Sequence, residues 1–389
     1  MIAILRQRAL YLMKSGLFLW IALGILGANA SAQSIVAGSG QSSNALGTAW
    51  VFAVSGDSRN CGDVVMPAFA AGARAKGASF YWHLGDFRAM FRVDEDFAHE
   101  PPYRSTLPSK AEYQKAAWND FIENQILPFG QIPVFLGIGN HELIDRTRDD
   151  YVAAFRKWLT APEIADQRMP DSSTARVKPY FHWMKAGVDF INMDNASDDQ
   201  FDSAQLAWFD AVLKSAVSDS TIRTIVVGMH KALPDSLSYG HSMSESPNIV
   251  SIESGRHVYR EMLKAQNDFG KKVYILASHS HIYMDGIFNT DFWPKNGGVL
   301  PGWIIGTAGA ELYQLPAGWR RARQAMQGVY GYLLATVNPE TDQGAPSDGT
   351  IRFEFHPVNP SDVPSAVRKK FTSELVDFCF NQNRRSPEP

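Results

Sequence analysis

Residues 133–142 read Pro-Val-Phe-Leu-Gly-Ile-Gly-Asn-His-Glu, an apolar run that ends in a polar Gly-Asn-His-Glu motif. The same arrangement, an apolar run followed at once by charged or metal-binding side chains, recurs elsewhere in the chain. The other motifs are Gly56-Asp57-Ser58-Arg59, Gly85-Asp86, His230, and His279-Ser280-His281. Loops at the carboxyl ends of strands are held by a rigid sheet and stay open to solvent, so these positions favour a ligand site.

Apolar runs alternate with helical patterns along the chain, which is typical of a layered α/β fold. Apolar residues recur at helical spacing between Ser203 and Val217, so this segment is predicted to be a helix that packs against the core. The runs Gly331–Val337 and Thr350–Phe355 are predicted to form a long-looped hairpin at the end of a sheet. The predicted strands are Ala49–Ser55, Ser79–Leu84, Pro133–Ile138, Val188–Met193, Ile222–Val227, Lys272–Ala277 and Trp303–Gly306.

A segment rich in proline and charge, Asp94–Lys110, separates the second motif from the third. It is predicted to be a surface loop that leads into a helix near Glu112–Ile126. This loop is a candidate lid over the site.

The motifs supply oxygen and imidazole donors of the kind that suit two divalent or trivalent ions such as Zn, Mn or Fe. Asp86 follows a strand and a glycine, where its carboxylate can bridge two cations. We expect the second ion to be bound by Asn140, His230 and His279, and the first by Asp57 and His281. A locally extended backbone at residues 279–281 would direct both imidazoles to the same side.

The amino terminus has the features of a secretory signal peptide, residues 1–32. Basic residues precede an apolar stretch from Leu17 to Ala28, and the small residues Ala30-Ser31-Ala32 form a cleavage site. A membrane anchor is the alternative, but the stretch is shorter than the roughly 18–20 residues that a spanning helix needs. We therefore expect a periplasmic or secreted protein whose mature chain, residues 33–389, is one domain without a membrane span.

Cys61 and Cys379 are the only cysteines of the chain. In an oxidising compartment they can form a disulfide that pins the carboxy-terminal segment beside the first motif. The alternative is two buried free thiols that behave as small apolar side chains.

The formal net charge of the chain is -3, so it has no global basic field. Nucleic acid is therefore not expected as a stable partner, and any attraction for phosphate must be local.

The order Asp-x-x, Gly-Asp, Gly-Asn-His-Glu, His and His-x-His resembles the calcineurin-like metallophosphoesterase family, including its purple acid phosphatase branch. The resemblance covers most of the mature chain. The stretch Gln205-Leu206-Ala207-Trp208-Phe209 also resembles a helix that is common in the phosphatase-like branch. The family implies a four-layer αββα sandwich, in which two mixed β-sheets are flanked by helices and both metals lie at one rim.

The chain departs from the family pattern at two positions. Arg59 stands where the family often has a histidine that binds the first metal, which leaves Asp57, Asp86 and His281 as ligands of that ion. Water or another residue can complete the set; the candidates are Asn60, His241 and His257. Ala89 stands where the purple acid phosphatases have a tyrosine, so the violet iron–tyrosinate colour is not expected.

The resemblance implies an exported phosphoesterase that hydrolyses small phosphomonoesters by attack of a metal-bound hydroxide on phosphorus. His141 matches the family's catalytic histidine and is expected to stabilise or protonate the leaving oxygen. Arg59 and Arg88 are candidate phosphate contacts, with ordinary ion pairs as the alternative. A phosphodiesterase or nucleotidase is the alternative within this reaction class. A non-catalytic binding protein with the same fold is the alternative from another class.

Overall fold

The computed structural model describes residues 47–171, 176–197, 200–238, 240–340 and 348–385. The expected signal peptide, residues 1–32, lies outside these ranges. Contacts group the chain from Leu46 onward into one compact unit. Within the described ranges, no helix has the length and apolar character needed to cross a membrane.

The first sheet has five strands, three of which run parallel. In sheet order they are β12 (Ile351–Val358), β11 (Tyr330–Val337), β1 (Trp50–Ser55), β2 (Tyr81–His83) and β3 (Val134–Leu136). Because β1, β2 and β3 are parallel, the motifs that follow them emerge at the same edge of the sheet. β11 and β12 pair antiparallel, which confirms the predicted hairpin.

The second sheet has seven strands. In sheet order they are β10 (Gln324–Met326), β8 (Tyr283–Asp285), β9 (Gly302–Ile305), β7 (Lys272–Ala277), β6 (Thr224–Gly228), β5 (Val188–Asn192) and β4 (Phe181–Lys185). β5, β6, β7 and β9 run parallel, so the motifs after β6 and β7 also share one edge.

Aromatic side chains fill the space between the two sheets. Phe52 of β1 and Phe80, just before β2, each meet Phe190 of β5 at a ring-centroid distance of 5.1 Å. At the other side of the interface Trp303 of β9 lies 4.2 Å from Phe353 of β12. The sheets are therefore packed face to face around a shared apolar core.

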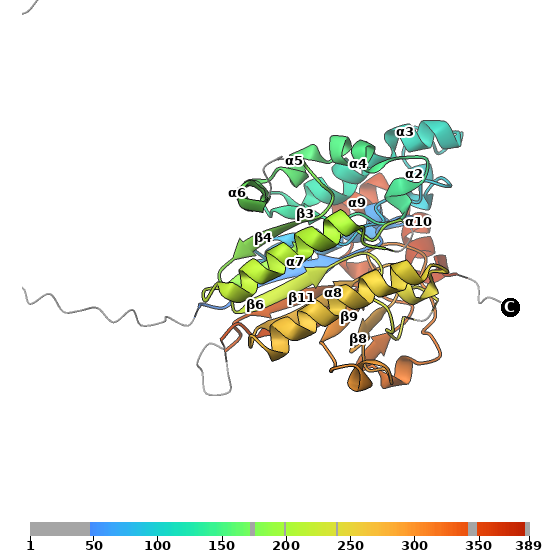
Figure 1. The fold of residues 1–389 in the computed structure, drawn as a ribbon. Helices are drawn as coiled ribbons and strands as arrows, with labels where there is room; N and C mark the ends of the chain where they lie inside the picture. The colour runs from blue at the N-terminus through green and yellow to red at the C-terminus, as the bar shows by residue number, and fades with distance from the viewer. Residues whose placement is uncertain (1–46, 172–175, 198–199, 239, 341–347, 386–389) are drawn as a thin grey trace, which may run out of the picture. The chain divides into compact units, whose positions relative to one another are not determined.

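Helices cover the outer face of each sheet. α7 (Ser203–Ser218) and α8 (Ile249–Asn267) lie side by side over the second sheet (Figure 1), and their apolar faces join its outer core. On the first sheet, Phe69 of α1 (Gly62–Ala75) meets Tyr332 of β11 at 5.1 Å. The layer order is thus αββα with two mixed sheets, which confirms the expected architecture.

The remaining helices are shorter. They are α2 (Glu95–Ala98), α3 (Lys110–Phe121), α4 (Arg148–Ala154), α5 (Arg156–Leu159), α6 (Pro162–Asp171), α9 (Ser365–Lys370) and α10 (Ser373–Asp377). A capping box between Ser109 and Glu112 begins α3, and a π-helical turn, Ile122–Ile126, continues it. The predicted helix near Glu112–Ile126 is therefore confirmed.

All the predicted strands are present, with ends shifted by no more than a few residues. β4, β8 and β10 were not predicted. The prediction of a surface loop over Asp94–Lys110 is wrong for the first residues of that segment. Asp94 and Asp96 are fully buried, since their carboxylates bind backbone amides and the Arg88 guanidinium.

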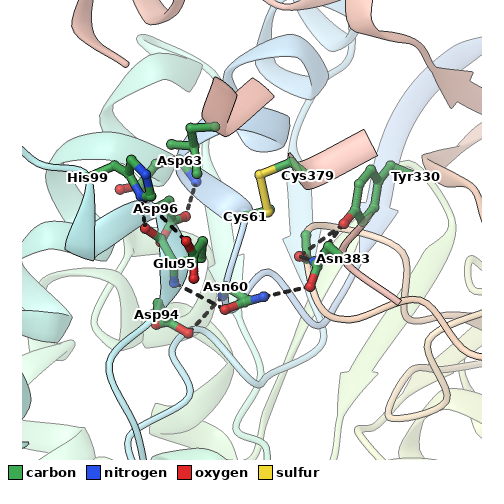
Figure 2. The surroundings of a disulfide bond; sticks show 12 residues. Asn60, Cys61, Asp63, Asp94, Glu95, Asp96, His99, Tyr330, Cys379 and Asn383 are labelled. Carbon is green, nitrogen blue, oxygen red and sulfur yellow. Dashed lines mark hydrogen bonds and ion pairs between the residues drawn. A yellow bond between two sulfur atoms is a disulfide. The ribbon is translucent and has the colours of Figure 1, made fainter. Parts of the chain in front are cut away.

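A disulfide joins Cys61 to Cys379, with a Cα–Cα distance of 5.8 Å (Figure 2). Beside it, Asn60 Nδ2 donates to Asn383 Oδ1 at 2.6 Å. Asn383 Nδ2 in turn donates to the Tyr330 hydroxyl at 2.7 Å. The disulfide hypothesis is confirmed, and the carboxy-terminal segment is held beside the first motif.

Replacing both Cys61 and Cys379 with serine is expected to lower the free energy of unfolding by about 2–5 kcal/mol, because the cross-link closes a very long loop. Guanidinium chloride unfolding of the oxidised wild type and the double variant measures this difference. Two free thiols in the denatured, unreduced wild-type protein would contradict the disulfide.

Candidate metal centre

Three motif residues hold a left-handed backbone directly after a strand. The φ angles are 61° at Asp57, 59° at Asp86 and 66° at His279. A non-glycine residue in this region costs about 1–3 kcal/mol, so it persists only where the surroundings impose it. Here, His279 donates its backbone N–H to Asp57 Oδ2 at 2.7 Å, which ties the edge of the second sheet to that of the first.

Four potential ligands meet around the Nε2 atom of His230. Asn140 Oδ1 and His279 Nδ1 each lie 3.0 Å from it, and Asp86 Oδ1 lies 3.3 Å from it. The ligand atoms of Asp86, His230 and His279 all lie within 4.8 Å of one another. The structure thus brings together the residues expected around the second ion.

Hydrogen bonds on the far side of His230 set its ring orientation. Nδ1 lies 3.0 Å from the Leu84 carbonyl oxygen, to which its N–H donates, so the Nε2 lone pair faces the cluster. Burial alone lowers the pKa of His230, but the nearby carboxylates, chiefly Asp86, raise it to about 9. The cluster therefore favours positive charge at this point.

The residues expected around the first ion also lie together. His281 Nε2 is 3.3 Å from Asp57 Oδ1, and its Nδ1 is 2.6 Å from the Glu311 carbonyl oxygen, to which it donates. Arg59 Nη2 lies 3.3 Å from the same His281 Nε2. The nearly buried Arg59 guanidinium therefore stands beside the two ligands of this position.

Of the three suggested replacements for the missing ligand, only His241 lies beside the cluster. Its ring is 5.4 Å from that of His279. Asn60 is engaged with Asn383 and with the backbone of Glu95. His257 pairs with Asp210 at 2.9 Å on the outer helices, where it cannot reach the centre.

The expected extended backbone at residues 279–281 is wrong. His279 is left-handed, and tight turns follow, with Ser280 N donating to Ser278 O at 2.7 Å and Ile282 N to Ser280 O at 2.8 Å. The two imidazoles still face the centre, His279 toward His230 and His281 toward Asp57. Their directions are therefore set by the turns and not by the alternation of side chains along an extended strand.

Glu142 connects the second motif with the third. Its fully buried carboxylate accepts hydrogen bonds from the backbone amides of Asp86, Phe87 and Gly139, each at 2.8 Å. Burial, with Asp86 nearby, raises the pKa of Glu142 to about 7. Glu142 therefore holds the loops that carry Asp86 and Asn140.

His141 lies at the edge of the cluster. Its Nδ1 donates to the Ala89 carbonyl oxygen at 2.6 Å, and its Nε2 lies 3.6 Å from Asp86 Oδ2. Burial is the main cause that lowers its pKa, although Asp86 opposes this. Phe91, which is 46% exposed, lies 5.5 Å away between ring centroids.

Arg88 lies in the interior of the protein, away from solvent. Its side chain is fully buried, so it is not available to a phosphate that arrives from solution. The carboxylates that contact Arg88 are those of Asp63, Asp94, Asp96 and Asp120. Next to these aspartates, Lys370 pairs with Glu100 at 2.5 Å. We therefore assign Arg88 a structural role.

Two residues beside the cluster were not found from the sequence. The ring of Tyr313 lies 4.0 Å from that of His281, and the guanidinium of Arg385 lies 5.0 Å from the centroid of Tyr313. Neither residue belongs to one of the polar motifs that follow the predicted strands. The signal that was available is Cys379, because its disulfide to Cys61 brings the following residues to the first motif.

The donor set fits divalent or trivalent ions. Carboxylate, amide oxygen and imidazole nitrogen are ligands shared by Zn, Mn and Fe. Asp57 Oδ1 is buried, and apart from His281 Nε2 at 3.3 Å it has no polar partner among the described residues, as expected for an atom that binds a cation. Asp86, His230, His279 and Asn140 would hold one ion, and Asp57, Asp86 and His281 the other.

Comparison with protein-family models found no match, and neither did a search of curated proteins. Two solved structures are similar in fold. PhoD is 12% identical, with 81% of this chain and 72% of that chain covered and a TM-score of 0.48. A dimetal phosphatase from Danio rerio is 10% identical, with 78% and 98% covered and a TM-score of 0.43. Neither TM-score reaches 0.5, so the functional conclusion rests on the side chains of the chain itself.

Glu142→Gln is expected to lower the free energy of unfolding by about 1–3 kcal/mol, because the amide presents an NH₂ group to buried N–H donors. It should also weaken metal binding, since the loops of Asp86 and Asn140 lose their connection. Urea unfolding and chelator competition measure the two effects. Glu163→Gln, on an exposed position of α6, is the control. A Glu142→Gln protein as stable as this control would contradict the assigned role.

Proposed function

We propose that the protein is an exported, metal-dependent phosphoester hydrolase of the calcineurin-like metallophosphoesterase family that acts on small phosphomonoesters. The observation that carries this proposal is the meeting of Asp86, Asn140 and His279 around His230. Asp57 and His281 form a second group of donors beside them. A purely structural cluster has no need for so many metal-binding side chains facing one another without a cation between them.

Ions of the Zn, Mn or Fe kind, when bound, lower the pKa of water toward roughly 7 and neutralise charge on a phosphoryl group. The contribution of the protein is to fix the donors before substrate arrives. The left-handed turns at Asp57, Asp86 and His279 and the carboxylate of Glu142 serve this purpose.

His141 is the proposed acid for the leaving oxygen. Because Nδ1 is committed to the Ala89 carbonyl oxygen, Nε2 is the atom that holds or transfers a proton. Asp86 lies on the Nε2 side, where its charge opposes the lowering of the His141 pKa by burial. A proton on Nε2 can thus pass to an alkoxide that departs from phosphorus.

Arg59 is the proposed phosphate contact. Its guanidinium lies beside His281, where the family more often has a metal ligand. A fixed planar cation there can donate to two oxygens of a phosphoryl group. It would supply positive charge on the side of the first ion.

Two features support export. The amino terminus has the pattern of a signal peptide, and the chain carries a disulfide, a bond that persists in oxidising compartments.

Hydrolysis of a phosphodiester or a nucleotide is the second candidate. It is favoured by Phe91, whose exposed ring lies beside His141 and is positioned to contact a base or an aromatic leaving group. A chromogenic monoester and a chromogenic diester compared on the same protein separate the two candidates.

The protein reconstituted with Zn, Mn or Fe is expected to hydrolyse the monoester faster than the diester. Asp86→Ala should lose both metal and activity. His141→Ala should keep its metal but lose about 10²–10⁴-fold in kcat, because only proton transfer is removed. Asp166→Ala, at an exposed aspartate of α6, should behave as wild type. Bound metal without turnover of either ester would favour a binding protein instead.

A further inference from the structure

Tyr313 stands between the metal cluster and the carboxy-terminal segment. On one side its ring contacts His281 at 4.0 Å and His241 at 5.0 Å. On the other it meets the guanidinium of Arg385 at 5.0 Å, and its hydroxyl is close enough to interact with that group. Only these two short contacts separate Arg385 from a proposed metal ligand.

A cavity of about 470 Å³ lies against the same residues. It is lined by residues 312–314, 327–328 and 384–385. Its volume is that of a site for a small molecule. Two adjacent arginines, Arg384 and Arg385, contribute positive charge to its wall.

The carboxy-terminal segment is fixed where it enters this wall. Arg385 N donates to Leu312 O, and Leu312 N to Asn383 O, both at 3.0 Å. Asn383 bonds to Asn60, and Cys379 is cross-linked to Cys61 (Figure 2). The backbone of Arg385 is therefore held near the centre by several bonds, which positions its side chain for recognition.

Further positive charge lies close by. Both Lys231 and Arg385 act electrostatically on His241, which lies beside His279. The dianionic phosphate of a monoester already has the metals and Arg59 as partners in the proposed function. Arg385, which contacts the Tyr313 ring rather than a proposed metal ligand, is thus placed to meet another part of the substrate.

We propose that Arg385 binds a second anionic group of the substrate, a carboxylate or a phosphate, so that the enzyme prefers phosphomonoesters that carry one. This inference rests on the proposed phosphomonoesterase function and names the substrate class of that site. A guanidinium binds either group through two parallel N–H···O bonds. The Tyr313 ring lies 4.0 Å from that of His281 and 5.0 Å from the Arg385 guanidinium, so a linker of a few atoms is the length to test.

The test compares three phosphomonoesters with the same three-carbon chain: propyl phosphate, 3-(phosphonooxy)propanoate and 1,3-propanediol bisphosphate. For the metal-loaded full-length mature protein, kcat/KM is expected to be about tenfold higher for at least one charged substrate than for propyl phosphate, mainly through KM. The charged substrate with the advantage identifies the second group as carboxylate or phosphate.

Arg385→Ala should reduce the ratio of charged to neutral kcat/KM toward one, and Arg385→Lys should retain part of it. Arg260→Ala, which removes an exposed positive charge from α8, is the control and should keep the wild-type ratio. The same ratio in Arg385→Ala and wild type would overturn the subsite while leaving the phosphatase intact. Failure to hydrolyse all three substrates would instead overturn the proposed function, and the subsite with it.

Discussion

The hydrogen bonds accepted by the Glu142 carboxylate are the interactions on which the centre depends most. The carboxylate binds three backbone amides from two loops, and those loops carry Asp86 and Asn140. Asp86 needs this support because its backbone is left-handed, a conformation that it would leave if unconstrained. The rigid edges of two packed sheets and one buried anion together fix donors that come from distant parts of the chain.

The sequence predicted most of what the parallel strands determine. The candidate metal ligands were found because each belongs to a polar motif that follows a buried run, and the structure brings them together. They are Asp57, Asp86, Asn140, His230, His279 and His281. The reason is topological, since parallel strands deliver their carboxyl ends to one edge of a sheet. The backbone at residues 279–281 escaped prediction because its turns depend on contacts with the other sheet.

The role of Arg88 could not be predicted from the sequence for a different reason. Its nearness to Asp86 in the chain suggested a phosphate contact, whereas its side chain is buried among aspartates contributed by several segments. Asp94 and Asp96 belong to a stretch that has the composition of a surface loop. Long-range charge pairing of this kind overrides local composition and leaves no periodic pattern to detect.

The carboxy-terminal segment brings further residues to the candidate metal centre. A disulfide and the bonds of Asn383 place Arg385 next to Tyr313, although the segment follows the last strand of the fold. Under the proposed function, residues that contact the substrate can thus change without disturbing the candidate metal ligands.

The central claim is that the carboxylate, amide and imidazole groups of the two candidate sites bind metal. Crystals of the mature protein grown with Mn or Zn, with anomalous difference maps recorded at the absorption edge of that metal, test it most directly. The account predicts one peak among Asp86, Asn140, His230 and His279, and a second beside Asp57 and His281, next to Arg59. The absence of a peak at the first of these positions would contradict it.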